Sequence, residues 1–261
     1  MKKKIALALA MTMMSTMVLA GCGSSEAGAG AAVYAVEAGS AGEAAAKEKG
    51  YEYNSVASQA DALMEVASGT SDAAIIDLLM AGAMIGEGTS YPNLIHTEEL
   101  TTEEYGVGCR KDSSLAAYIN AVFAESYADG SMQEIAAKYG VQEALLEQKT
   151  CDYPSVEGDL AKIQEKGTLI VGITEFEPMD YQDEAGEWIG FDADMAKLVA
   201  EKLGVEAEFV VIDWDNKVME LNSGNIDVVW NGMTLTKEVT ESMECTNAYC
   251  NNAQVVVVPA E

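Results

Sequence analysis

The sequence predicts an α/β fold with mostly parallel sheets. Short runs of Val, Ile and aromatic residues alternate with segments whose apolar residues follow the helical period, and glycines close most of these segments. Buried strands are clearest at residues 72–77, 168–173 and 226–230. A chain of 261 residues is long enough for one large domain or two small lobes.

The expected elements alternate along the chain. Strands are predicted at residues 33–38, 51–57, 72–77, 94–100, 104–110, 168–173, 207–212, 226–230 and 253–259, and helices at residues 40–49, 59–68, 78–85, 114–128, 131–139, 159–166, 191–203 and 216–221. Ser40 and Glu43 fit a capping box, and free amides at this helix start can bind an anion. A capped helix end that faces solvent is the alternative. Residues 141–157 lose their periodicity after Gln148, which predicts a connector.

Residues 1–21 have the pattern of a secretory signal. Three lysines precede an apolar run that is too short and too well bounded to predict a stable membrane span. The small residues before Cys22 resemble the lipobox of bacterial lipoproteins, which implies that Cys22 is lipidated and becomes the mature N-terminus. A plain secretory signal is the alternative. Residues 22–32 are small and flexible, as expected of a tether on the membrane surface.

Charge and composition exclude several classes of partner. The net charge of −28 would repel nucleic acid phosphates, so no nucleic acid partner is expected. No cysteine pair has zinc-like spacing, and Cys245 and Cys250 are either free thiols or a short disulfide loop. The single histidine, His96, leaves no cluster for a metal and little scope for a Ser-His-Asp triad. We therefore expect neither a metal nor a cofactor.

The stretch IDVVWNGMTLTKEV, residues 226–239, is the first candidate binding site. It begins as a strand and continues into small and polar residues. Gly232 lets a ligand approach the backbone, and Asn231 and Thr234 offer hydrogen-bonding groups. Ligands of open α/β sheets bind at the carboxyl ends of strands. An ordinary strand-to-helix turn capped by Thr236 is the alternative interpretation.

Longer motifs resemble the polar amino-acid-binding proteins of ABC importers. Residues 158–258 contain GTLIVGITEFEPMDY, GFDADMAKLVAEKLG, DVVWNGMTLT and NAYCNNAQVVVV, which are similar to the N-terminal part of that family. Residues 33–140 contain AVEAGSAGE, SGTSDAAIID, EEYGVGCRK and SYADGSMQEIAAKYG, which are similar to its C-terminal part. The resemblance implies a two-lobed periplasmic-binding-protein-like fold with a mostly parallel sheet in each lobe and a ligand cleft between the lobes.

The two parts occur in the reverse of the family order, which looks like a circular permutation. A rearranged or misassembled gene is the alternative. The resemblance places lobe two at residues 33–103 and lobe one at residues 104–258. Residues 141–157 would then connect the family's old C-terminus and old N-terminus. The new chain ends would fall where the family crosses between lobes, and permutation is tolerated when such ends lie at the surface.

The resemblance also implies a ligand site. The family's ligand-binding positions are occupied here by eight residues: Ser40, Ala41, Asp77, Phe176, Trp214, Asn231, Gly232 and Thr234. Phe176 and Trp214 would sandwich the ligand side chain, and Asp77 would bind its ammonium group. Core packing is the alternative for the aromatic pair. Val239 replaces an Arg that clamps the ligand carboxylate in the family, and Lys237 is a candidate substitute. An ammonium group on the ligand is therefore better supported than a carboxylate.

The predicted function is that of an exported, lipid-anchored solute-binding protein. It would capture a small amino acid or related amine and deliver it to the membrane subunits of an ABC importer, and a monomer is expected. One alternative is an enzyme on this fold, such as a dehydratase or a cell-wall lyase, with Glu175 and Glu177 as acid or base candidates. A sensor subunit and a non-binding relic are further alternatives.

Overall fold

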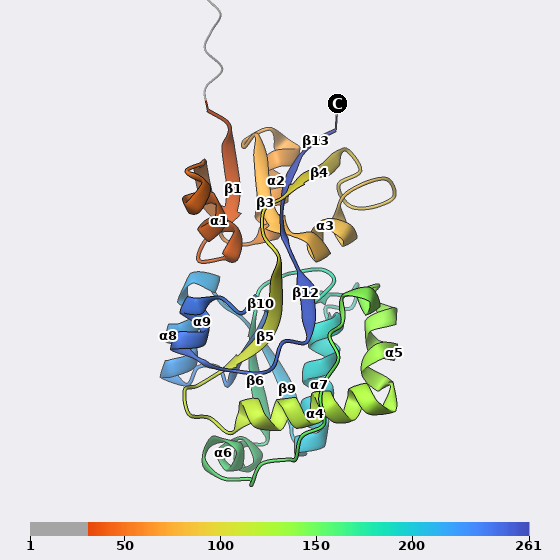
Figure 1. The fold of residues 1–261 in the computed structure, drawn as a ribbon, viewed down its shortest axis with the longest axis vertical. Helices are drawn as coiled ribbons and strands as arrows, with labels where there is room; N and C mark the ends of the chain where they lie inside the picture. The colour runs from red at the N-terminus through yellow and green to blue at the C-terminus, as the bar shows by residue number, and fades with distance from the viewer. Residues whose placement is uncertain (1–30, 261) are drawn as a thin grey trace, which may run out of the picture. The chain divides into compact units, whose positions relative to one another are not determined.

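The computed structural model describes residues 31–260, which form two β-sheets flanked by helices (Figure 1). The signal predicted at residues 1–21, the lipidation predicted at Cys22 and most of the tether lie outside the described residues. No helix within residues 31–260 has the length and hydrophobicity that crossing a bilayer requires. We keep the terms lobe two and lobe one for the two sheets with their helices.

Lobe two is built on a five-stranded sheet of order β2-β1-β3-β13-β4. Its strands are β1 (Val33–Glu37), β2 (Glu52–Val56), β3 (Ala73–Asp77), β4 (Leu94–Glu99) and β13 (Gln254–Pro259). Its helices are α1 (Ala41–Lys49), α2 (Gln59–Ser68) and α3 (Leu78–Met84). The Ser40 hydroxyl accepts a hydrogen bond of 3.1 Å from the Glu43 N–H, so the predicted cap of α1 is present.

Lobe one is built on a six-stranded sheet in which β11-β5-β10-β6-β9 follow one another and β12 also pairs with β5. Its strands are β5 (Glu103–Cys109), β6 (Thr168–Ile173), β9 (Glu206–Val211), β10 (Val228–Thr234), β11 (Glu244–Cys245) and β12 (Cys250–Asn252). A small hairpin pairs β7 (Tyr181–Gln182) with β8 (Trp188–Ile189). The helices are α4 (Leu115–Asp129), α5 (Ser131–Lys138), α6 (Gly158–Lys166), α7 (Phe191–Leu203), α8 (Lys217–Ser223) and α9 (Lys237–Ser242), with 3₁₀ turns η1 (Gln142–Ala144) and η2 (Trp214–Asn216).

The two-lobed α/β fold predicted from the sequence is confirmed, but both sheets are mixed rather than mostly parallel. The pairs β1–β2, β1–β3, β6–β9 and β6–β10 are parallel, as expected for strands joined through helices. The antiparallel pairs involve β5 and β13, which are the strands that enter a lobe from the other one. A strand that arrives from the opposite lobe runs against its neighbours, and this makes each sheet mixed.

Strand β13 lies in the sheet of lobe two, whereas we expected residues up to 258 to lie in lobe one. It inserts between β3 and β4, with Val255 opposite Ile76 and Val256 opposite Ile75. Val255, Val256 and Val257 are buried on both faces of the strand, as its place in the middle of a covered sheet requires. The chain therefore crosses between lobes at Ala253 and again between β4 and β5, and Figure 1 shows these two crossings side by side.

An aromatic cluster forms the centre of lobe one. Phe123 of α4 packs edge-on against Trp230 of β10 at 5.6 Å and against Tyr249 at 5.5 Å. All three side chains are fully buried. Such edge-to-face pairs add about 0.5–1.5 kcal/mol each to the stabilisation from burial. The cluster fixes the position of β10, the strand that carries the predicted site residues Asn231, Gly232 and Thr234.

The predicted connector runs along lobe one without a helix or strand after η1. The Leu146 N–H donates to the Tyr249 carbonyl at 2.9 Å, and the Gln148 side chain donates to the Ala248 carbonyl at 2.9 Å.

The four cysteines of the described residues are free thiols, so Cys245 and Cys250 form no disulfide here.

Candidate functional site

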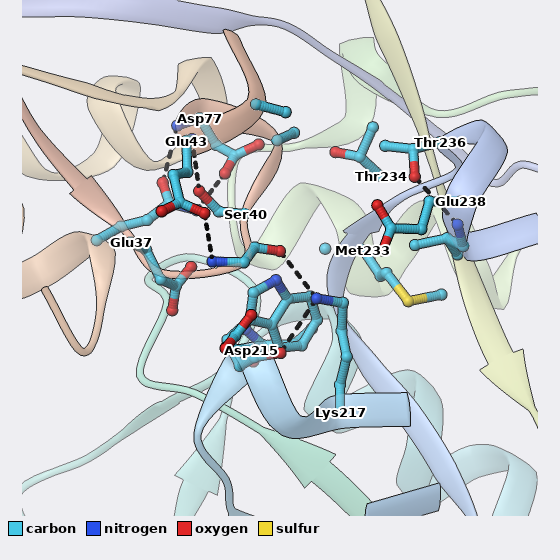
Figure 2. A pocket seen from close by; sticks show the side chains of 18 of the residues that line it. Glu37, Ser40, Glu43, Asp77, Asp215, Lys217, Met233, Thr234, Thr236 and Glu238 are labelled. Carbon is cyan, nitrogen blue, oxygen red and sulfur yellow. Dashed lines mark hydrogen bonds between the residues drawn. The ribbon is translucent and has the colours of Figure 1, made fainter. Parts of the chain in front are cut away.

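A cavity of about 460 Å³ lies between the two lobes (Figure 2). Lobe two contributes the ends of β1 and β3 and the start of α1, while lobe one contributes η2, α8 and the segment from β10 to α9. The carboxyl ends of parallel strands in both sheets therefore face this cavity, which is where α/β sheets bind ligands. Its chemistry is set by charged side chains, which include Glu37, Glu43, Asp77, Asp215, Lys217 and Glu238.

The structure brings seven of the eight predicted site residues to this cavity. They are Ser40, Ala41, Asp77, Trp214, Asn231, Gly232 and Thr234. Phe176 is absent from the lining; it is 2% exposed and its ring packs edge-on against Tyr105 at 6.3 Å. A Cβ atom on Gly232 would come 2.5 Å from the Phe176 ring, so the ring lies directly behind this end of β10. Phe176 therefore supports the cavity wall from the core, which agrees with the packing alternative.

The polar end of β10 is held by hydrogen bonds within lobe one. The Gly232 N–H donates to the Asp192 carboxylate at 2.6 Å. The Asn231 side chain accepts from the Thr174 N–H at 3.0 Å and donates to the Thr174 hydroxyl at 2.8 Å. Two donors that we expected to meet a ligand are thus engaged within lobe one. The Thr234 hydroxyl makes no hydrogen bond with residues 31–260, and so remains available at the cavity.

A protein carboxylate occupies the start of α1. The Gly39 N–H donates to Glu43 at 3.1 Å, and Lys47 forms an ion pair with the same carboxylate at 2.8 Å. Burial raises the pKa of Glu43, but the hydrogen bonds from Lys47 and Gly39 outweigh it and lower the pKa overall. This negative charge competes with a ligand carboxylate at the amides of Ser40 and Ala41.

The Asp77 carboxylate is the centre of a hydrogen-bond network between the lobes. Its four donors are the side chains of Gln59, Tyr105, Asn252 and Gln254. The Tyr105 hydroxyl donates at 2.6 Å and the Gln254 amide at 3.0 Å, both to Oδ1. Burial raises the pKa of Asp77 well above its ordinary value, and the nearby Glu103 carboxylate adds to the effect. Oδ2 has only one protein donor among the described residues, so one lone pair remains for a ligand.

Lys217 is a cavity residue that the sequence analysis missed. Its Nζ donates to the Gly39 carbonyl at 2.8 Å and to the Trp214 carbonyl at 3.1 Å, and lies 4.9 Å from the centre of the Trp214 ring. Burial lowers the pKa of Lys217. The candidate substitute Lys237 behaves differently, because its side chain is 88% exposed and lies 3.6 Å from Glu241. In the sequence, the feature that could have indicated a role for Lys217 at the cavity was its position about one helical turn after Trp214.

Glu37 is the second cavity residue that the sequence analysis missed. The residue is 3% exposed, and its Oε1 has no hydrogen-bond partner within residues 31–260. Burial raises the pKa of Glu37 to about 8, although Thr174, Lys217 and Gln59 favour the charged form. A charged residue at the end of the apolar strand VYAVE was the available signal. A buried carboxyl group with a free oxygen is a strong acceptor for a cationic donor.

The C-terminal part of the chain has recognisable relatives. Residues 169–261 match the family described as bacterial extracellular solute-binding proteins, family 3. For this part of the chain, the resemblance to amino-acid-binding proteins of ABC importers is confirmed. An L-cystine-binding protein of Escherichia coli K12 is 36% identical over 94 residues, which cover 36% of this chain and 35% of that protein. The chain thus spans about a third of the length of the curated relatives that it matches.

Enzymes and solved structures also occur among the relatives. A cyclohexadienyl dehydratase of Pseudomonas aeruginosa is 34% identical over 83 residues, which cover 31% of each chain. The structure of an ancestral cationic amino acid solute-binding protein is 40% identical, covers 32% of this chain and 37% of its own, and has a TM-score of 0.31.

Proposed function

We propose that this protein is an extracytoplasmic solute-binding protein that captures a small, ammonium-bearing, amino-acid-like solute for an ABC importer. The observation that carries the proposal is the cavity between the lobes, where buried carboxyl groups face a space large enough for such a solute. A solute that contacts both lobes stabilises their closed arrangement. The eight predicted residues form the proposed site, and Phe176 supports it from behind β10.

The proposed chain organisation is a circular permutation of the family. Residues 33–103 and β13 form lobe two, residues 104–253 form lobe one, and residues 141–157 join the family's old termini. The position of β13 supports this proposal, because this strand follows lobe one in the chain and pairs with β3 and β4 of lobe two. The predicted lipid on Cys22 would hold the receptor at the outer face of the membrane, next to the importer. Metabolic labelling with a fatty acid tests the anchor, and Cys22→Ser should abolish the label.

A binding screen tests the proposed function. Purified mature protein is heated in the presence of the common amino acids, their decarboxylated amines and short peptides, because a specific ligand raises the melting temperature by mass action. Hits are titrated by calorimetry. We expect ammonium-bearing solutes among the hits. A protein that binds no member of the panel would contradict the proposal.

A dehydratase-like enzyme is the second candidate function. The observation that favours it is Glu37, because a buried carboxyl group whose pKa is about 8 can donate or accept a proton near neutral pH. The earlier candidates are less suitable, since Glu175 is exposed and neither Glu175 nor Glu177 lines the cavity. Incubation of each hit with the protein, followed by product analysis, separates the two functions. Solutes that bind but remain chemically unchanged after incubation favour the function of a binding protein.

A further inference from the structure

We propose that Glu37 is the residue that receives the ammonium group of the bound solute. This assignment rests on the proposed function and differs from the one made from the sequence, which gave that role to Asp77. Three observations carry it: the free oxygen of Glu37, the occupied oxygens of Asp77, and the position of Glu37 at the cavity.

The carboxyl oxygens of Glu37 and Asp77 differ in the number of hydrogen-bond donors that reach them. A carboxylate offers about four acceptor sites. Four protein donors reach Asp77, and three of them share Oδ1. Oε1 of Glu37, by contrast, is buried without a donor from any of residues 31–260. An ammonium group carries three N–H donors, so it can satisfy this oxygen and still reach the remaining site on Asp77. An ammonium group should therefore stabilise Glu37 more than Asp77, because Oε1 of Glu37 has no donor among the described residues whereas both oxygens of Asp77 already accept hydrogen bonds.

Glu37 and Asp77 both lie at the edge of the sheet that faces the cavity. Glu37 ends β1, Asp77 ends β3, and these strands are parallel neighbours, so the two carboxyl groups lie at the same edge of the sheet. Both residues line the cavity, and Lys217 of lobe one faces them. Figure 2 shows Glu37, Asp77 and Lys217 around one space. An ammonium group at Glu37 would therefore lie between the lobes, where it favours closure.

The arrangement also defines the class of solute. Lys217 uses two of its three N–H donors on carbonyl groups, and Glu43 already occupies the start of α1. A ligand carboxylate thus finds few free donors, and Val239 supplies none where the family has Arg. The cavity is suited to a primary amine, and a carboxylate on that amine contributes little. We expect a decarboxylated amine to bind within about tenfold of the parent amino acid, since one charge-assisted hydrogen bond is at stake.

Binding should release a proton. Burial keeps Glu37 largely protonated below its pKa of about 8, and an incoming ammonium group would replace that proton, which passes to the buffer. The charged groups that face Glu37 are Lys217 of α8, Asp61 of α2 and Asp77 of β3. Of these, Lys217 favours the carboxylate, while Asp61 and Asp77 oppose it. Affinity for the amine should therefore rise by roughly tenfold or more from pH 6 to pH 8, while the amine itself remains protonated.

Calorimetry of Glu37→Gln tests the assignment. The probes are the common amino acids and their decarboxylated amines, and the tightest binder of the wild-type protein is used for every variant. We expect Glu37→Gln to weaken binding by about 30-fold or more, because an ionic acceptor is lost from a buried site. The matched control is Glu48→Gln, which removes the same charge from an exposed residue of α1 outside the cavity and should change affinity by less than about threefold.

Two further results distinguish a failure of the Glu37 assignment from a failure of the proposed function. Titrations in two buffers with different ionisation enthalpies report the protons released, and Glu37→Gln should lose the release that the wild-type protein shows. Wild-type binding that is independent of pH and releases no proton would overturn the assignment even if the variant fails to fold. Equal affinity of Glu37→Gln and the wild-type protein would also overturn it, while the proposed function would stand. A wild-type protein that binds no probe would overturn both.

Discussion

The ammonium nitrogen of Lys217 lies 2.8 Å from the carbonyl oxygen of Gly39, and this contact joins the two lobes across the cavity. Gly39 precedes Ser40, the N-cap of α1 in lobe two, and Lys217 begins α8 of lobe one. A hydrogen bond between them requires the lobes to be close together. The structure therefore shows an arrangement that is closed around the cavity, and this contact is one that opening would break.

Gly39→Ala should weaken ligand binding by obstructing closure. A Cβ atom at this position would lie 2.7 Å from the Asp215 Cα in the opposite lobe, and Gly39 also has a φ of +70°. The control is Gly50→Ala, because Gly50 has a φ of +69° and no described atom within 4 Å of such a Cβ. Both variants should lose about 1–2 kcal/mol of stability from the left-handed backbone. Only Gly39→Ala should lower affinity in calorimetry; equal affinities would contradict this role.

Lys217→Met should favour the open arrangement. The substitution keeps much of the side-chain volume but removes the donor to the Gly39 and Trp214 carbonyls. Hydrogen bonds to charged groups contribute about 1.5–3 kcal/mol, so affinity should fall by roughly 10- to 100-fold. Small-angle scattering of the ligand-free variant should give a larger radius of gyration than that of the wild-type protein.

Lys237→Met is the matched control for Lys217. It removes the same charge from a side chain that is exposed and paired with Glu241 on its own helix. Exposed pairs of this kind contribute about 0.3–0.5 kcal/mol, so the radius of gyration should be unchanged. If the two variants gave the same scattering curve, the contact between Lys217 and Gly39 would have no special part in closure.

Local signals explain why most elements could be predicted from the sequence. Helix α2 begins after Ser58, whose hydroxyl accepts from the Asp61 N–H at 3.1 Å, and it ends at Gly69 with a φ of 75°. Both signals lie within one turn of the helix that they delimit. The helix boundaries predicted at residues 59–68 agree with the structure for this reason, and Gly204 ends the helix at residues 191–203 in the same way as Gly69 ends α2.

The roles of Glu37 and Lys217 depend on contacts that no local pattern encodes. Glu37 is buried because β1 lies between β2 and β3, while Lys217 is buried because it reaches across to the other lobe. Their sequence separation is large. Glu37 lies in the motif AVEAGSAGE, but the resemblance gave it no role, and Lys217 lies outside the motifs that we had identified. The position of β13 was missed for a similar reason, since VVVV is equally suited to either sheet. Phe176 illustrates the limit of a resemblance, because its neighbour Tyr105 sets where the ring packs.

Asp77→Asn should destabilise the protein as well as weaken binding. Asn has one acceptor oxygen in place of two, and its amide group would face at least one of the four donors around Asp77. Unsatisfied buried groups cost about 1–3 kcal/mol each, so the melting temperature should fall by about 5–10 °C. Affinity should fall too if Oδ2 gives its remaining lone pair to the ligand.

Asp215→Asn is the control for the Asp77 substitution. Asp215 also lines the cavity, but its residue is exposed. Exposed substitutions usually stay within about 0.5 kcal/mol, so its melting temperature should match that of the wild-type protein. Thermal unfolding followed by circular dichroism measures both variants. If Asp77→Asn melted at the wild-type temperature, the network around Asp77 would contribute nothing to stability.

Glu37→Gln should change how stability depends on pH. The pKa of Glu37 is raised from 4.5 to about 8 in the folded protein, so the folded state holds a proton that the unfolded chain releases in this range. Stability from this group is therefore fully present below pH 4.5 and is lost as the pH rises towards 8. The slope is at most about 1.4 kcal/mol per pH unit, and we expect a total change of about 2–4 kcal/mol. Gln at this position does not titrate. The free energy of unfolding of the variant should therefore increase relative to that of the wild-type protein as the pH rises.

Urea unfolding of both proteins at several pH values measures this difference. Other buried acids, such as Asp180 and Asp192, also have a raised pKa because of burial, but they titrate in both proteins and cancel when the two curves are subtracted. Glu48→Gln is again the control, and its curve should run parallel to the wild-type curve because Glu48 is exposed. If the Glu37→Gln curve also ran parallel, Glu37 would be ionised in the folded protein at neutral pH. The carboxyl group would then have no proton to release when an ammonium group binds.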